Sequence, residues 1–116
     1  MTVLATACSK SPPREPARAD LALRTRQAAG LVLEASCGEC HIGYYPTAVP
    51  AALAVFDLST PDWPRRMTDR QLRDLITRAA SPLDTRGQPQ HLSAADVDRV
   101  TRFVEHELAT RSSGSR

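Results

Sequence analysis

The residues whose types and spacing could do chemistry are Cys37, Cys40 and His41, in the run Cys-Gly-Glu-Cys-His. Two thiols three residues apart lie on one side of a helical turn, within reach of the two vinyl groups of one haem. They can add across those vinyl groups to form thioethers, and His41 is then held beneath the iron as its proximal axial ligand. The run therefore predicts one covalently attached haem c.

Three other interpretations of the two thiols stay open. A zinc site would need two further ligands, and His91 and His106 are 15 residues apart, unlike the usual second ligand pair. A redox-active dithiol of the thioredoxin kind would lie between a strand and a helix, whereas this pair follows a predicted helix. The pattern fixes only three residues, so chance occurrence is the third alternative.

Length and composition limit what can surround this motif. The chain has 116 residues, the size of one domain, and 4% of them are aromatic. A haem would supply the large apolar body that such a core lacks. The net charge of +2 does not indicate a nucleic-acid binder, and three cysteines are too few for a disulfide scaffold. No apolar run approaches the roughly 20 residues of a membrane-spanning helix.

Both ends of the chain are predicted to lie outside the compact domain. Residues 1–8 resemble the end of a bacterial lipoprotein signal in which Cys8 becomes the lipidated N-terminus, provided that the true start lies further upstream. The alternative is an unstructured start with an incidental cysteine. A Pro-rich stretch at 9–18 is typical of a semi-stiff spacer. We therefore divide the chain into a partial signal and linker at 1–19, a domain at 20–110, and a disordered tail at 111–116.

Three main helices, and no strand, are predicted within the domain. The first covers about 20–35, the second starts at Thr68 with a capping box to Gln71, and the third starts at Ser93. The segment between the motif and Thr68 is rich in proline and is expected to be mostly turns, with a short helix around 51–56. Helical spacing predicts three apolar faces: Leu21, Ala28, Leu31, Val32 and Ala35; Leu72, Leu75, Ile76 and Ala79; and Val97, Val100, Phe103, Val104 and Leu108.

Over roughly residues 20–110 the sequence resembles a class I, single-haem c-type cytochrome. That family has a small residue eight positions before the first motif cysteine and a bulky one four before it, and here these are Ala29 and Leu33. The resemblance implies an all-α, cytochrome c-like fold with three main helices around one covalently bound haem. It implies that Ala29 packs against Phe103, and that Trp63 donates its ring N–H to a haem propionate, with packing over the core as the alternative.

The sequence departs from this family at the distal iron ligand. The family usually has a methionine in the loop before the last helix, where this sequence has Gln88, and amides are poor iron ligands. His91, three residues further on, would give a bis-histidine iron, which lowers the reduction potential. Met67 is the only internal methionine and would raise it. The alternatives are a solvated His91, a core Met67 under Trp63, and a vacant sixth position.

The resemblance implies one-electron transfer to redox partner proteins, in the periplasm or on the outer face of a bacterial membrane. A haem-based gas-binding or sensor module and a haem subunit of a larger oxidoreductase are the alternatives. No paired carboxylates or nucleophile accompany the motif, so an enzyme acting alone is not indicated.

Several residues near the motif and the second helix have weaker signals. Tyr44 and Tyr45 are expected to wall the haem pocket, and Pro50 could start a short helical turn or brace His41. An arginine cluster is expected to be a solvated helix face, with a docking patch or contacts to haem propionates as alternatives: Arg65, Arg66, Arg70 and Arg73.

Overall fold

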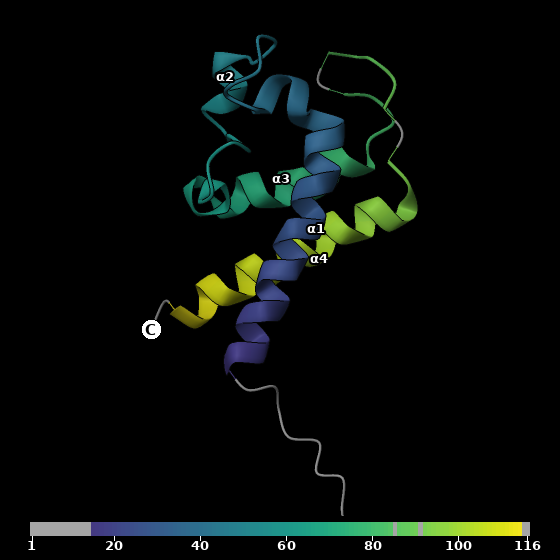
Figure 1. The fold of residues 1–116 in the computed structure, drawn as a ribbon. Helices are drawn as coiled ribbons and strands as arrows, with labels where there is room; N and C mark the ends of the chain where they lie inside the picture. Colours follow the sequence, from purple (N-terminus) through teal and green to yellow (C-terminus); the bar gives the residue numbers. More distant parts are fainter. Residues whose placement is uncertain (1–14, 85, 91, 115–116) are drawn as a thin grey trace, which may run out of the picture.

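The computed structural model describes residues 15–84, 86–90 and 92–114, and these ranges are mostly helical. The elements, in chain order, are α1 (Glu15–His41), α2 (Pro50–Leu53), the 3-10 helix η1 (Trp63–Arg66), α3 (Asp69–Ala80) and α4 (Ala94–Gly114) (Figure 1). Within the described ranges the only β-type pairing is an isolated bridge between Leu83 and Pro89. The prediction of an all-α chain is confirmed.

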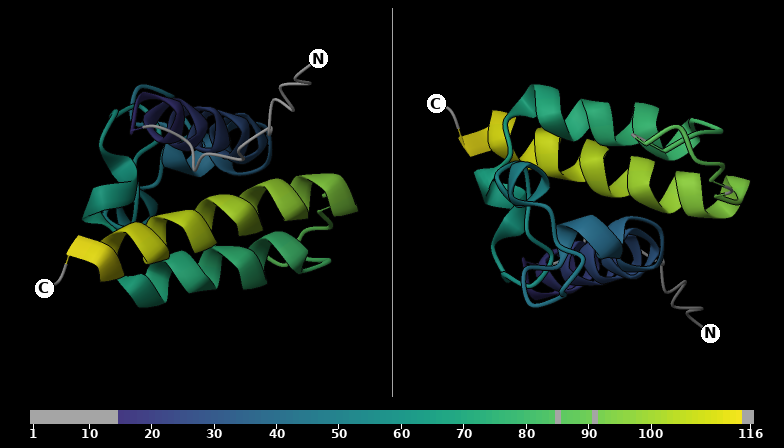
Figure 2. Two further views of the ribbon diagram at one scale, coloured as in Figure 1. Left: turned by 90° about the horizontal axis from the view of Figure 1, so that it is seen from below. Right: turned by 90° about the horizontal axis from the view of Figure 1, so that it is seen from above.

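The three long helices build the core. Helices α3 and α4 run antiparallel side by side, and α1 crosses α4 on one side of this pair (Figures 1 and 2). Ala29 and Phe103 are both buried, and they belong to one core cluster, which agrees with the close approach expected for these helices. The fully buried side chains of largest volume are Leu33, Leu72, Val100, Phe103 and Val104.

Local signals determine where α3 and α4 begin. The Thr68 hydroxyl accepts a hydrogen bond from the Gln71 N–H (3.1 Å), and the Gln71 side chain accepts one from the Thr68 N–H (2.9 Å), which completes the predicted capping box. The Ser93 hydroxyl accepts from the Asp96 N–H (3.1 Å) at the start of α4. The predicted apolar faces of both helices belong to the core cluster or pack against it, except for Val97, which is partly buried outside the cluster.

Three predicted boundaries were wrong. Helix α1 begins at Glu15 instead of residue 20, because a proline such as Pro16 is tolerated in the first turn of a helix. It also continues past Ala35 to His41, so the whole motif lies in its last turns. Helix α4 extends to Gly114, into the segment that was predicted to be a disordered tail.

The predicted apolar face of α1 was also partly wrong. Leu21 and Leu31 are 57% and 69% exposed, whereas Ala29, Val32 and Leu33 are buried. Three consecutive apolar residues, 31–33, satisfy more than one helical face, so periodicity alone could not select the buried one.

No helix in the described ranges is both long and apolar enough to cross a membrane. The predicted lipid anchor at Cys8 and most of the predicted linker lie outside the described residues, so those predictions stay as they were.

Candidate functional site

A cavity of about 770 Å³ lies beside the C-terminal end of α1, and all three motif residues line it. One side, which we call the α1–α2 wall, includes Leu33, Cys37, Cys40, His41, Ala52 and Phe56. The other side, the α3–loop wall, includes Met67, Leu75, Arg78, Ala79, Leu83 and Leu92. The volume falls within the range of about 300–1,000 Å³ that is usual for small-molecule and cofactor sites.

The imidazole of His41 is held in a defined orientation. Its Nδ1 lies 3.0 Å from the carbonyl oxygen of Phe56, and its ring stacks on the Phe56 ring with centroids 3.7 Å apart. Because a carbonyl only accepts, Nδ1 carries the proton and the lone pair is on Nε2. Burial lowers the pKa of His41, although the hydrogen bond to Phe56 partly opposes this, so the neutral ring is favoured. A carbonyl-bound Nδ1–H is the usual support for a histidine that binds metal through Nε2.

The two motif cysteines are free thiols, and each is partly buried. Burial is the main cause that raises the pKa of Cys37, and the nearby Cys40 adds to it, so Cys37 stays protonated near neutral pH. Between them, Gly38 is buried, and a Cβ atom there would lie 2.9 Å from Cδ1 of Ile42. A larger residue at this position would therefore require the end of the Ile42 side chain to move.

The segment after the motif folds back and is tied to the end of α1. The Val49 N–H donates to the Cys40 carbonyl (3.1 Å), and the Leu58 N–H donates to the His41 carbonyl (2.8 Å). Pro50 begins α2, whereas the carbonyl that braces His41 belongs to Phe56.

Asp57 organises the turn next to that carbonyl. Its Oδ1 accepts from the Gly43 N–H (3.0 Å), the Ser59 N–H (2.9 Å) and the Ser59 hydroxyl. The hydrogen bond from the Ser59 hydroxyl is the largest cause that lowers the pKa of Asp57. This carboxylate therefore fixes the backbone position from which Phe56 reaches His41.

The Phe and Trp rings extend from His41 into the core. The Phe56 and Trp63 centroids are 5.7 Å apart, and those of Trp63 and Phe103 are 5.3 Å apart. Trp63 is 5% exposed and is not among the cavity-lining residues, so its surroundings agree with the packing alternative, and the propionate contact stays a prediction.

Tyr44 and Tyr45 do not wall the cavity, contrary to expectation. They are 75% and 41% exposed, and their rings contact each other edge to face at 5.1 Å. The aromatic wall is provided instead by Phe56, which was predicted only as the end of a short helix.

The candidate distal ligands differ in their position relative to the cavity. Met67 is 2% exposed and lines the α3–loop wall, and it is also part of the core cluster. Gln88 is exposed and does not line the cavity. His91 lies outside the described residues.

An arginine from α4 holds the backbone that carries Met67. Arg111 donates from Nη1 to the Met67 carbonyl (2.7 Å) and from Nη2 to the Pro64 carbonyl (2.5 Å). It also pairs with Asp69 at 3.0 Å and Glu107 at 3.6 Å. Sequence reasoning missed this residue, because nothing local connects position 111 with position 67.

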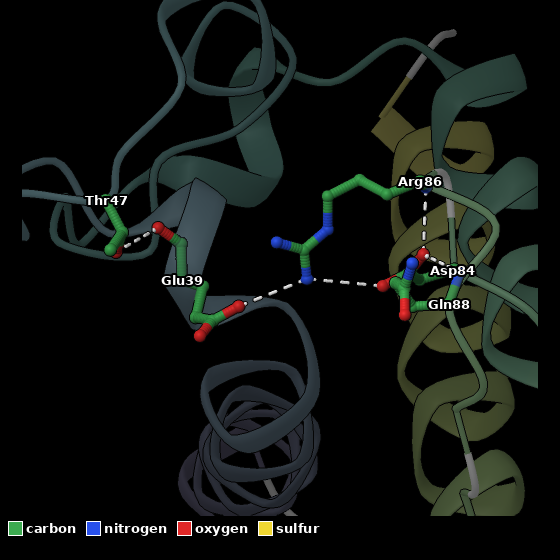
Figure 3. Close-up of polar contacts among 5 residues, drawn as sticks. All are labelled: Glu39, Thr47, Asp84, Arg86 and Gln88. Atoms are coloured by element: carbon green, nitrogen blue, oxygen red, sulfur yellow. Dashed lines mark hydrogen bonds and ion pairs between the residues drawn. The ribbon is translucent and has the colours of Figure 1, made fainter.

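A second arginine joins the two walls at the Cys40 end of the cavity. Nη2 of Arg86 lies 3.1 Å from Oε2 of Glu39 and 3.3 Å from Oδ2 of Asp84 (Figure 3). Oδ1 of Asp84 accepts from the backbone N–H groups of Arg86 and Gln88, both at 2.8 Å, and the latter is the main cause that lowers the pKa of Asp84. The loop is thus ordered by its own turn, in which Gly87 has a φ of 77°.

Among the described residues, no group of three or more His, Cys, Asp or Glu side chains converges closely enough to hold a bare metal ion. A haem iron does not depend on such a group, because the porphyrin itself supplies four nitrogen ligands and the protein supplies only the axial ones.

No protein-family model, curated protein sequence or solved structure matches this chain.

Proposed function

We propose that the chain is a single-haem c-type cytochrome that transfers one electron at a time. The observation that carries this proposal is the position of Cys37, Cys40 and His41 on one cavity wall, with Nδ1 of His41 already bound to a carbonyl. The donor set fits the group: two free thiols for the vinyl groups, one neutral imidazole for the iron, and a cavity of about 770 Å³ for the ring.

The chain's own residues have distinct roles in this proposal. Cys37 and Cys40 hold the cofactor covalently, and the Phe56 carbonyl keeps Nε2 of His41 available for the iron. A haem bound in this way supplies reversible cycling between Fe(III) and Fe(II). Apolar side chains of both walls, such as Leu33 and Leu75, exclude water from its faces, which favours the less charged state.

We assign the distal position to Met67. Its side chain is buried in the α3–loop wall, and Arg111 fixes its backbone, whereas Gln88 is exposed and does not line the cavity. The cytochrome c-like arrangement of the helices is part of the same proposal. A motif helix that packs on the last helix, with Ala29 and Phe103 in the same buried cluster, is what a class I c-type cytochrome would need. Redox partner proteins and a location in the bacterial cell envelope follow from it.

Expression of the full chain behind an export signal, with a cytochrome c maturation system, tests the proposal. We expect haem that resists acid–acetone extraction in the wild type and in Cys8→Ser, which removes the one cysteine outside the motif. We expect none in Cys37→Ser/Cys40→Ser. Each single variant should retain haem through one thioether, with a pyridine haemochrome band shifted towards that of a vinyl-bearing haem.

Two results would overturn the proposal. One is a helical, folded wild-type protein that binds no haem. The other is haem that extracts completely, because that would show a non-covalent site to which the two cysteines contribute nothing specific.

A further inference from the structure

Helix α1 has an apolar side that the rest of the described chain does not cover. Leu23 and Leu31, which lie on this side, are 49% and 69% exposed. They are eight residues apart, close to two helical turns, so they point in nearly the same direction. The core is built from another side of α1, with Ala29 and Leu33.

A shallow groove of about 560 Å³ runs along the uncovered side of α1. It is lined by α1 between Leu23 and Glu34, with Leu31 among its residues, and by residues 58–61 across from the helix. The Arg26 side chain donates a hydrogen bond to the Pro61 carbonyl, which ties the two sides of the groove together. The groove is thus formed within one chain, and exposed apolar residues gathered in this way are typical of a contact with another molecule.

The glycine in this groove has no role within its own chain. Gly30 lies in the interior of α1, where glycine destabilises a helix relative to alanine. A Cβ atom at Gly30 would meet no neighbouring group within 4 Å, whereas one at Gly38 would lie 2.9 Å from Cδ1 of Ile42. A glycine with open space above it is what the close approach of a second backbone requires.

The first turns of α1 bury little surface against the rest of the fold. They extend past the point where α1 crosses α4, and residues 17–24 are exposed except for Ala22, which is partly buried (Figure 1). Short helical segments are marginal in water when nothing packs against them. A second helix laid along α1 would cover these turns as well as the groove.

The charges of α1 show which way such a helix would run. Residues 15–26 contain three arginines and two acidic residues, a net charge of +1, whereas residues 27–41 contain two glutamates and no arginine or lysine, a net charge of −2. The helix dipole adds to this division, because its N-terminal end is partially positive and its C-terminal end partially negative. Two copies of α1 therefore attract when antiparallel and repel when parallel.

We propose that the uncovered side of α1 binds a second copy of this chain, with the two α1 helices antiparallel and a two-fold axis at Gln27. Leu23 and Leu31 are each four residues from Gln27, so the axis brings Leu23 of each copy against the partner's Leu31. Glu34 has no ion-pair partner in the described part of its own chain, and this register places it one turn from the partner's Arg24.

This dimer does not rest on the proposed function. Cys37 and Cys40 are 10 and 13 residues beyond the axis, so the two motifs lie roughly 30–40 Å apart along the helix pair. Each cavity stays within one chain, and association can be measured with or without haem.

Sedimentation velocity of the full chain, from about 1 μM to 500 μM, tests the proposal. Leu31→Ser removes the central apolar contact. Leu21→Ser is its matched control, because Leu21 is 57% exposed on the same helix but does not line the groove. Both side chains are exposed, so both variants should keep the helical circular dichroism spectrum of the wild type. Gly30→Ala is the third variant.

We expect a reversible monomer–dimer equilibrium in the wild type and in Leu21→Ser, and about tenfold weaker association in Leu31→Ser. Gly30→Ala should also weaken association, yet raise the thermal midpoint of the monomer, because alanine favours the helix and has space there. A monomer at every concentration would overturn the proposal. Equal weakening by Leu21→Ser and Leu31→Ser would also overturn it, because the contact would then lie elsewhere.

Disulfide cross-linking tests the antiparallel orientation. In a Cys8→Ser background, Leu23→Cys and Leu31→Cys proteins should form a linked dimer when they are mixed, and at least about tenfold less when each is oxidised alone. Cys8→Ser by itself controls for linkage through the motif cysteines. Linkage of each variant to itself, with none between the two, would show a parallel pair and contradict the proposed arrangement.

Discussion

The two walls of the cavity are built in different ways. The α1–α2 wall is one continuous stretch of chain, and its imidazole is positioned by a carbonyl 15 residues away. The α3–loop wall combines the end of η1, helix α3 and the loop that follows, and Met67 is positioned by Arg111, which is 44 residues away in sequence. The first wall depends mainly on local structure, whereas the second requires the packing of α4.

This difference indicates where the site is robust and where it is fragile. Thioethers and a braced histidine would survive modest changes in helix packing. A distal ligand that is carried by a long-range contact would be lost first, when the protein is warmed or when α4 is weakened. The following changes are chosen to break or refine this contrast between the walls.

Met67→Leu should have the largest effect. It nearly conserves volume, so it should cost below about 1.5 kcal/mol in unfolding free energy, but it removes the sulfur. We expect loss of the low-spin spectrum of the reduced protein and rapid binding of CO. His91→Ala is the comparison variant and should leave both properties unchanged. The reverse pattern, with His91→Ala opening the iron to CO, would show that Met67 is only a core residue and that the distal ligand comes from the loop.

Arg111→Gln should have the next largest effect, and only on the α3–loop wall. Loss of its bonds to the Met67 and Pro64 carbonyls should lower the unfolding free energy by about 1–3 kcal/mol. Chemical denaturation measures this, and the low-spin spectrum should fade at a lower temperature than in the wild type. Arg102→Gln, which removes an exposed pair on the same helix, serves as control. An unchanged thermal loss of the low-spin state would separate Arg111 from ligation.

Asp57→Asn probes the α1–α2 wall through pH. Hydrogen bonds lower the pKa of Asp57 in the folded protein below its ordinary value of 3.8, so its ionised form stabilises the fold. This contribution is present above pH 3.8 and disappears as the pH falls through the lower, folded value. The lead of the wild type over Asp57→Asn in denaturant midpoint should therefore shrink towards acid pH. Ser59→Ala should show a smaller loss of denaturant midpoint with the same pH dependence. A difference between wild type and Asp57→Asn that grows towards acid pH would contradict the role given to the Asp57 carboxylate.

Arg86→Gln should have the smallest effect, although it removes the visible link between the walls. The side chains of Arg86 and Glu39 are more than half exposed, so water and salt screen their attraction. We expect slightly faster hydrogen exchange in residues 81–90, with haem retention unchanged, and no difference from the wild type at about 1 M salt. Loss of haem in this variant would mean that the link between the walls, and not the motif alone, retains the cofactor.

Sequence alone predicted the parts of this protein that depend on neighbouring residues. The capping box at Thr68 and Gln71, the Ser93 cap and the buried faces of α3 and α4 are all local patterns, and the structure confirms them. The motif was recognised in the same way, because its spacing lies within two helical turns. The structure places its three residues together on the cavity.

What the sequence could not predict depends on contacts between distant segments. Nothing near Phe56 indicated that its carbonyl and ring would hold His41, and nothing near Arg111 indicated a bond to Met67. For Trp63 the sequence left open a contact to the cofactor or packing over the core, and the structure places its ring between two Phe rings in the core. Leu31 was expected to be buried but is exposed. An apolar run such as 31–33 satisfies more than one helical face, so spacing alone did not identify the buried one.

Mass spectrometry of the tryptic peptide 27–65, which contains the whole motif and no internal Arg or Lys, would decide whether haem is attached at this site. Protein produced with haem maturation should give this peptide with one haem and with neither Cys37 nor Cys40 available to a thiol alkylating reagent. A peptide without haem, with both cysteines alkylated, from protein that was folded before digestion would contradict the proposed attachment.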